Sequence, residues 1–306
     1  MEKVLRDQNY DFSAPPAYAR FSAGSNKVKV VAYESGKIVV QGKETREFVE
    51  FTLEPCVTKK AILGYESVHQ PELLLPRIGV DESGKGDFFG PMCVAAVYVN
   101  SAVLECWKTL DVKDSKHIGS DRRISEIAKQ IKETKGCVWT VVPIGNAAYN
   151  RLYKSMRSVN RILAWGHARV IENLMLKSYQ MDPKPVRAIS DQFAQDKATV
   201  ARALMQEGRN IELIQRHKAE SDAAVAAASI LARDEFVKRL GSLSKTIGYD
   251  LPKGASPAVD KIAQQIFKER GEPALADICK AHFRNWYRAQ GLAEPPKKEW
   301  RKKSKE

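Results

Sequence analysis

Residues 77–91, with the sequence RIGVDESGKGDFFGP, place two carboxylates, a lysine and several glycines beside one another. Asp81 and Glu82 close a short apolar run that is typical of a buried strand. Because neighbouring strand residues point to opposite faces of a sheet, a backbone bend is needed before both acids can face one ion. Lys85 lies between two of the glycines, where the backbone can turn sharply or approach a ligand closely. Acids, a lysine and bare backbone together suit a metal ion that handles phosphate.

Two other interpretations of this stretch are open. A strand that ends in a polar turn explains most acidic pairs, but the glycines and the second apolar run, Met92–Val99, make it the weaker explanation here. Gly79, Gly84 and Lys85 also match the glycine spacing of a phosphate-binding P-loop. That match fails at Gly86, where a serine or threonine hydroxyl should hold Mg²⁺. The two acids would also lie inside a loop whose purpose is to cradle anions.

Apolar runs after residue 76 predict the strands that position these side chains. The predicted strands cover residues 77–81, 92–99, 137–142, 186–190 and 211–215. Helical patterns lie between the later runs, an order that fits an α/β domain, and hairpins are expected between the early strands. The fourth run ends at Asp191, and a carboxylate at the end of a central strand can meet Asp81 if the two strands are neighbours. A strand-end turn or a helix cap is the alternative role for Asp191.

The beginning of the chain predicts a separate small α+β module. Residues 27–33 alternate as a half-buried strand does, and they form a predicted hairpin with residues 37–41 across a Glu-Ser-Gly turn. A helix is predicted for residues 45–53. The order of residues 1–16, a polar segment that ends in a proline pair, is left open.

Charge and composition indicate the class of partner. The 306 residues carry a net charge of +13, which favours a polyanion and above all a nucleic acid. The five cysteines form no C-x-x-C pair, which argues against a zinc site and for reduced thiols in a cytosolic protein. No apolar stretch reaches about 18 residues, and the polar N-terminus lacks a signal-peptide core. We therefore expect a cytoplasmic location, no membrane span and no obligate protein partner.

Residues 79–91 closely resemble the first active-site motif of the prokaryotic type 2 ribonucleases H, which comprise the HII and HIII enzymes. Later stretches resemble the other family motifs: residues 112–116 the second, 190–193 the third, and 218–220 with 228–230 the fourth. This resemblance implies the ribonuclease H-like fold, a mixed sheet flanked by helices. It also implies endonucleolytic cleavage of RNA paired to DNA, which leaves a 3′-hydroxyl and a 5′-phosphate.

The resemblance assigns roles to individual residues. The implied metal ligands and catalytic acids are Asp81, Glu82, Asp191 and Glu220. The implied substrate-binding residues are Gly84, Lys85 and Gly86, which would read the RNA 2′-hydroxyl, and Ser115 and Lys116, near the substrate backbone. Two divalent ions, Mg²⁺ or Mn²⁺, are expected because hard oxygen ligands favour them over zinc. The spacing from Glu220 to Ser229 is one residue shorter than in many relatives, so Asp222 competes with Glu220 as the fourth ligand, and Glu220 is preferred.

Three features bear on the choice between HII and HIII. Residues 33–37 (YESGK), followed by Gln41-Gly42, resemble the N-terminal domain of ribonuclease HIII, which is similar to half of the TATA-binding protein and is implicated in substrate binding. Glu220 also indicates HIII, because HII enzymes carry aspartate there. Lys85 departs from this pattern, since HIII enzymes commonly have a small hydroxyl residue at that position. We hypothesise that Lys85 widens the activity from RNA–DNA hybrids to single ribonucleotides embedded in a DNA duplex.

The resulting division of the chain is a TATA-binding-protein-like substrate-binding domain at residues 1–70, a catalytic domain at 71–294 and a basic tail at 295–306. Two functions from other classes are alternatives to the ribonuclease. One is a noncatalytic nucleic-acid-binding protein on this fold, against which the intact set of acids argues. The other is a junction resolvase of the same superfamily, against which the N-terminal hairpin motif argues.

Overall fold

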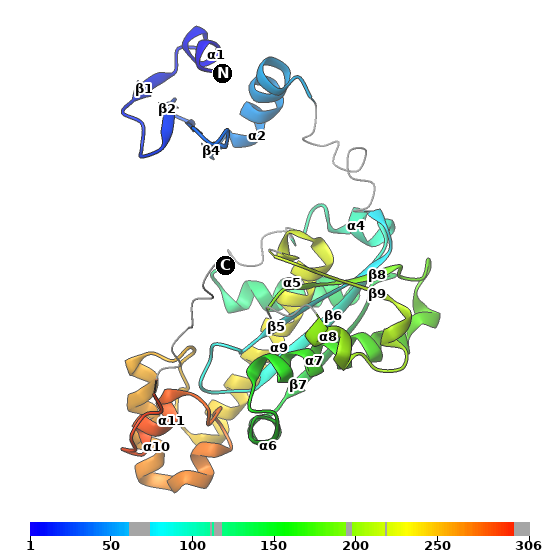
Figure 1. The fold of residues 1–306 in the computed structure, drawn as a ribbon, viewed down its shortest axis with the longest axis vertical. Coiled ribbons are helices and arrows are strands. Elements are labelled where there is room, and N and C mark those ends of the chain that lie inside the picture. The colour runs from blue at the N-terminus through cyan, green and yellow to red at the C-terminus, as the bar shows by residue number, and fades with distance from the viewer. Residues whose placement is uncertain (61–73, 111, 113–117, 194–197, 218, 297–306) are drawn as a thin grey trace, which may run out of the picture. The chain divides into compact units, whose positions relative to one another are not determined.

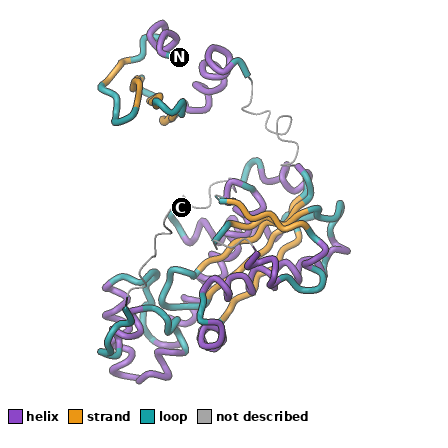
Figure 2. The backbone as a smooth tube through the Cα atoms, viewed as in Figure 1, coloured by secondary structure: helices purple, strands orange, loops and turns teal. Residues whose placement is uncertain are grey.

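The structure is a computed structural model of the chain, and it describes residues 1–60, 74–110, 112, 118–193, 198–217 and 219–296. The chain forms two compact units, an N-terminal unit at Met1–Leu73 and a C-terminal unit at Leu74–Glu306. Figure 2 shows strands and helices in each unit. Each unit has a sheet and an apolar core of its own.

The N-terminal unit is built on a four-stranded antiparallel sheet with the order β1-β2-β3-β4. The strands are β1 (Asp11–Ser13), β2 (Ala19–Gly24), β3 (Val28–Tyr33) and β4 (Ile38–Gly42). The helices are α1 (Glu2–Asp7) and α2 (Thr45–Phe48), and α2 continues as the π-helix η1 (Val49–Thr58). Leu5 of α1, Val30 of β3 and Phe48 of α2 pack together and are almost fully buried. The helices therefore cover one face of this sheet.

The predicted hairpin of this unit is confirmed, because β3 pairs with β4 from Val28 and Gly42 to Ala32 and Ile38. The segment left open in the sequence holds α1 and β1, and β2 was not predicted at all. The reason is local. Strand β1 has only three residues, and in β2 Ser22 and Ala23 are both buried, so neither strand shows the usual alternation.

The C-terminal unit contains a mixed five-stranded sheet with the order β7-β6-β5-β8-β9. Its strands are β5 (Arg77–Ser83), β6 (Met92–Val99), β7 (Val138–Ile144), β8 (Arg187–Asp191) and β9 (Glu212–Arg216). Strands β5, β6 and β7 pair antiparallel, whereas β8 pairs parallel to both β5 and β9. All five predicted strands are present with ends within two residues of those expected, and the predicted mixed sheet flanked by helices is confirmed.

Helices cover both faces of this sheet (Figure 1). They are α4 (Ser101–Trp107), α5 (Asp121–Glu133), α6 (Asn146–Met156), α7 (Val159–Met175), α8 (Ala198–Ala203), α9 (Ala223–Ile247), α10 (Pro257–Ala276) and α11 (Arg284–Ala289), with short 3₁₀ turns η4 (Ser178–Gln180), η5 (Gly208–Asn210) and η6 (Ala219–Ser221). Strand β6 is buried on both faces: Cys93 and Ala95 pack with α5 and α9, and Val94 and Ala96 with α6 and α7. This accounts for its unbroken apolar run.

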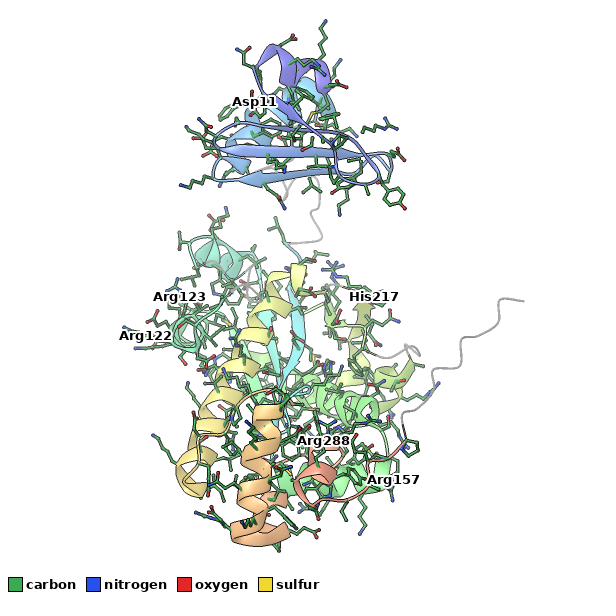
Figure 3. The ribbon with its side chains drawn as sticks, turned by 90° about the vertical axis from the view of Figure 1, so that its left-hand side faces the viewer. Asp11, Arg122, Arg123, Arg157, His217 and Arg288 are labelled. Carbon is green, nitrogen blue, oxygen red and sulfur yellow. The ribbon has the colours of Figure 1, made fainter. Side chains whose placement is uncertain are left out.

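Helix α9 lies directly against β5 (Figure 3). A Cβ atom at Gly79 of β5 would lie only 2.1 Å from the backbone carbon of Ala224 in the first turn of α9. The start of α9 is also tied to β5 by an ion pair between Arg77 and Asp222 at 2.9 Å, with both side chains at most 2% exposed. These contacts fix the position of the segment that precedes α9.

Basic side chains lie on the surface of the C-terminal unit, in keeping with the net charge of +13. The side chains of Arg122 and Arg123 at the start of α5, and of His217 after β9, lie on the surface (Figure 3). None of the helices in the described ranges combines the length and the hydrophobicity needed to cross a membrane.

Candidate active site

Asp81, Glu82 and Asp191 lie at one edge of the C-terminal sheet. The parallel pairing of β5 with β8 ends at Val80 and Ser190, so the next residue of each strand is an acid. The condition for Asp191 to meet Asp81, that their two strands are neighbours, is therefore met. Strand β5 continues in pairing with β6 through Glu82 and Ser83, which gives the acidic pair a rigid support.

Asp81 is a partly buried residue whose carboxyl group lies near two other acids. Burial raises its pKa to about 8, and the charges of Glu82 and Asp191 act in the same direction. Hydrogen bonds from the Glu82 amide, at 2.9 Å, and from the Ser229 side chain on α9 oppose this shift. A cation at this position would favour the ionised form, because it would offset both the lost hydration and the repulsion between carboxylates.

Glu82 has the opposite electrostatic environment. Burial works against its ionisation, but His167 and Lys85 outweigh burial and hold the pKa of Glu82 below its usual value. The Nε2 atom of His167 on α7 donates a hydrogen bond to Glu82 Oε2 at 3.0 Å, and Lys85 Nζ lies 3.6 Å from Glu82 Oε1. The ring of Phe193 packs edge-on against His167, with centroids 4.9 Å apart. Lys85 Nζ lies 5.6 Å from the centre of the Phe193 ring. The adjacent acids thus differ in how readily they ionise.

His167 contacts the acidic pair, although none of the sequence motifs includes it. The structure buries it completely and bonds it to an acid 85 positions earlier. The available signal was a polar ring in the apolar row of α7, which requires a buried partner. Ser229 lies in the fourth family motif, but its hydrogen bond to Asp81 is likewise visible only in the structure.

Glu220 and Asp222 have different environments. Glu220 lies on η6, and the amide of the preceding Ala219 donates to Asp191 Oδ1 at 3.5 Å, so the backbone of η6 contacts the acidic edge one residue before Glu220. Asp222 is 2% exposed and is bonded to Arg77, and it also accepts from the Ala224 amide at 2.9 Å as the N-cap of α9. A carboxylate held in this way is not available to a metal ion, which favours Glu220 as the fourth ligand.

The loop after the acids exposes its backbone at Lys85 and Gly86. Gly84 has φ +88°, and a Cβ atom there would lie 2.3 Å from the Pro91 carbonyl oxygen, so glycine is required. Gly86 has open space on its Cβ side, with no atom within 4 Å, and Lys85 is 41% exposed at its side chain. Ser115 and Lys116, predicted to approach the substrate, lie outside the described residues.

The donor set fits a hard divalent cation, since it consists of carboxylate oxygens on strand ends and on one turn. In the described part of the chain, however, no three His, Cys, Asp or Glu side chains are close enough to hold one ion. Asp81, Glu82 and Asp191 are within electrostatic range of one another rather than at coordination distance. Carboxylates repel, so a tighter cluster requires the charge of a cation.

Comparison with known proteins identifies relatives along almost the whole chain. Residues 78–286 match the family model described as Ribonuclease HII, and residues 4–62 match a domain of unknown function. The ribonuclease HIII of Protochlamydia amoebophila is 45% identical over 285 residues, which cover 92% of this chain and 91% of the relative. The ribonuclease HIII of Chlamydia muridarum is 42% identical over 295 residues, which cover 95% and 93%.

A solved structure agrees with these relatives in both sequence and fold. The crystal structure of Bst-RNase HIII in complex with Mn²⁺ is 32% identical, with a TM-score of 0.66, and the match covers 95% of each chain. A match that covers 95% of the chain includes both units. The two curated relatives, which match over a similar length, are also named ribonuclease HIII. With its acids gathered at the edge of a ribonuclease H-like sheet, the chain belongs to the ribonuclease HIII family.

Proposed function

We propose that Asp81, Glu82, Asp191 and Glu220 are the catalytic acids with which this ribonuclease H cleaves the RNA strand of RNA–DNA hybrids. The observation that carries the proposal is the meeting of Asp81 and Asp191 on adjacent parallel strands, with Glu82 beside them. Glu220 joins this set through the contact of the Ala219 amide with Asp191. Two buried acids away from this edge, Asp222 and Asp234, are instead held in ion pairs.

In the proposed reaction a water oxygen bonds to phosphorus as the bond from phosphorus to the 3′-oxygen breaks. The products are a 5′-phosphate and a 3′-hydroxyl. Two bound divalent ions, Mg²⁺ or Mn²⁺, would stabilise the charge on the attacking and leaving oxygens. The protein's own groups orient the ligands: Ser229 and the Glu82 amide hold Asp81, while His167 and Lys85 hold Glu82. The open backbone at Gly86 is available to the ribose 2′-hydroxyl.

The other parts of the chain are proposed to increase affinity. Residues 1–70 would bind the duplex as a substrate-binding domain, and the basic tail at 295–306 would add nonspecific attraction to phosphates. In the N-terminal unit the sheet carries exposed basic side chains, including Arg20 and Lys29. These two roles rest on charge and on the family resemblance.

We expect divalent cations to raise the melting temperature of the protein, because they bind the folded acids and not the unfolded chain. The measurement is thermal unfolding in EDTA and in millimolar Mg²⁺ or Mn²⁺. With concentrations about 100 times the dissociation constant, the stabilisation is about 3 kcal/mol. A melting temperature that neither ion moves would contradict the metal site.

The fourth ligand can be tested with two variants. We expect Glu220→Gln to lower hybrid cleavage by at least about 100-fold with little change in stability, since even groups that merely support a ligand contribute 10–100-fold. Asp222→Asn should instead destabilise the fold by about 3–5 kcal/mol, because it leaves Arg77 buried without its charge partner. Cleavage rates and urea unfolding distinguish the two effects. A fully stable Asp222→Asn protein without activity would assign the ligand role to Asp222.

Two labelled duplexes test the substrate range in Mg²⁺ and, separately, in Mn²⁺. One has an all-RNA strand paired to DNA, and the other has a single ribonucleotide in duplex DNA. We expect the enzyme to cut both. Lys85→Ser should lower cleavage at the single ribonucleotide by about tenfold relative to the hybrid, the loss expected for one charge-assisted hydrogen bond. If the single ribonucleotide stays uncut in both metals, Lys85 does not widen the substrate range, although hybrid cleavage would still support the assignment.

A further inference from the structure

Lys280 is a fully buried lysine in the segment between α10 and α11. In the described ranges no carboxylate lies within ion-pair distance of its ammonium. Its Nζ atom instead donates to the carbonyl oxygens of Asp87, at 2.8 Å, and Gly90, at 2.6 Å. Both acceptors belong to the loop that follows the catalytic acids. Both printed hydrogen bonds of the Lys280 ammonium therefore go to this loop, and its other described contact is with the Tyr149 ring, 5.9 Å from the centroid.

The backbone around Lys280 binds the same loop. The Lys280 amide donates to the Phe88 carbonyl at 2.9 Å, and the Gly90 amide donates to the Ile278 carbonyl at 2.9 Å. These bonds form an antiparallel bridge between Phe89 and Cys279. The ammonium extends this bridge with two further bonds on the loop side.

Asp87 connects Lys280 to the turn that contains Gly84, Lys85 and Gly86. Its carbonyl is held by Lys280, and its side chain accepts from the Gly254 amide at 2.6 Å. Its own amide donates to the Gly84 carbonyl at 3.3 Å, which closes the turn over Lys85 and Gly86. Any displacement of Asp87 therefore moves this turn.

An ammonium in this place has an energetic cost that packing does not explain. Burial lowers the pKa of Lys280 to about 8, although the charge of Asp87 opposes that shift. An apolar side chain of similar length would fill the same space without this cost. What lysine adds is a pair of charge-assisted bonds, the strong kind, to two loop carbonyls. This points to a role in the geometry of the loop.

We propose that Lys280 is a positioning residue for substrate selection: it fixes the loop from Gly84 to Pro91 so that the Gly84-Lys85-Gly86 backbone meets the ribose 2′-hydroxyl in one geometry. The inference rests on the proposed role of these three residues in reading that hydroxyl. Lys280 acts through Asp87 and does not itself contact the substrate.

The test measures selectivity for the 2′-hydroxyl. Two hybrids are compared, one with an all-RNA strand and one in which the ribose at the cleaved position carries 2′-fluorine. The readout is kcat/KM for the all-RNA hybrid divided by kcat/KM for the 2′-fluoro hybrid. We expect Lys280→Met to lower this ratio by about tenfold or more, since a misplacement of about 1 Å can cost 10²-fold. A purely structural defect would lower both rates equally and leave the ratio unchanged.

Two variants complete the experiment. Lys132→Met is the matched control, because it removes another lysine bonded to an interior group, Asp234, but has no contact with the loop; its ratio should equal that of the wild type. Gly86→Ala tests the proposed function itself and should lower the ratio. If Gly86→Ala lowers the ratio and Lys280→Met does not, Lys280 does not position the loop, but the proposal that the loop backbone reads the 2′-hydroxyl stands. If neither variant changes the ratio, loop readout is wrong as well.

The pH dependence of the wild-type ratio provides a measurement that does not need a variant. Asp87, Cys93, Cys279, Tyr149 and His282 are the titratable groups packed around Lys280. Burial raises the pKa of Cys93 to about 12, raises those of Cys279 and Tyr149 further, and lowers that of His282 to about 4. Among these cysteines, the tyrosine, the histidine and Lys280, only the lysine should lose its proton between pH 7 and about 9.5.

The ratio should therefore fall as the pH rises through about 8, because a neutral amine holds the two carbonyls less strongly. The ratio is measured at saturating divalent ion, because a bound cation would keep Asp81, whose pKa is also raised to about 8, ionised across this range. A wild-type ratio that stays constant from pH 7 to 9.5 would overturn the inference even if Lys280→Met failed to fold.

Discussion

Asp81→Asn is expected to lower hybrid cleavage by about 10³-fold or more while leaving the metal-free protein at least as stable as the wild type. The loss exceeds the 10–100-fold typical of groups that only support a ligand, because Asp81 lies at the centre of the proposed metal site. The metal-free variant is expected to be stable because asparagine carries no charge at this position. Burial, together with the charges of Glu82 and Asp191, raises the Asp81 pKa to about 8, so its ionised form is unfavourable in the fold without a cation.

The sign of the pH effect can be derived from this pKa. Between about pH 4 and pH 8 the folded protein keeps a proton on Asp81 that the unfolded chain has lost. The wild type must therefore lose stability as the pH rises through this range, by up to about 1.4 kcal/mol per unit. Asparagine does not titrate, so the variant should gain relative to the wild type from pH 5 to pH 8. Urea unfolding in EDTA at both pH values measures this difference.

Asp234→Asn is the matched control, and its expected effect is opposite. Burial also disfavours the charge on Asp234, but hydrogen bonds from Lys238, Ser125 and Lys132 outweigh burial and lower its pKa. That carboxylate stabilises the fold at neutral pH and its contribution is lost as the pH falls, so Asp234→Asn should be least stable relative to the wild type at pH 8. If Asp81→Asn instead destabilised the metal-free protein at pH 8, Asp81 would be a structural residue.

The sequence predicted the sheet and the acids because both have local signatures. A strand buried on both faces is a continuous apolar run, as in Met92–Val99, and its ends are marked by polar residues. Asp191 is the last residue of another apolar run, so the sequence places its carboxylate at the end of a strand and therefore at the edge of the sheet. The neighbour relation between β5 and β8 was the remaining condition, and the parallel pairing meets it.

The groups that orient these acids were not predictable, because their partners are distant in the chain. His167 meets Glu82 across 85 positions, and Arg77 meets Asp222 across 145. Lys280 reaches Asp87 across 193. The sequence shows each as a polar residue in an apolar setting, and this requires a buried partner without naming it. Asp222 illustrates the consequence, because its contacts with Arg77 and with the Ala224 amide, which the sequence does not show, identify it as a structural carboxylate.

Gly79→Ala is expected to destabilise the protein by about 3 kcal/mol or more, the upper end of the cost of overpacking. The new Cβ atom would lie 2.1–2.4 Å from backbone atoms of Ala224 and Val225. Backbone cannot rotate away as a side chain does, so α9 must shift from β5. That shift would also displace Ser229, which holds Asp81, and η6, which carries Glu220. Hybrid cleavage should therefore fall even at temperatures where the variant remains folded.

Gly241→Ala is the matched control on the same helix, and it should change stability in the opposite direction. Gly241 is exposed in the interior of α9, and its Cβ position has no atom within 4 Å. Alanine there removes the entropic cost of glycine in a helix and should add about 0.5–1 kcal/mol. Urea unfolding of both variants gives the comparison. Equal stabilities for the two would mean that α9 does not rest on β5 at Gly79, and the position of Glu220 beside Asp191 would lose its structural basis.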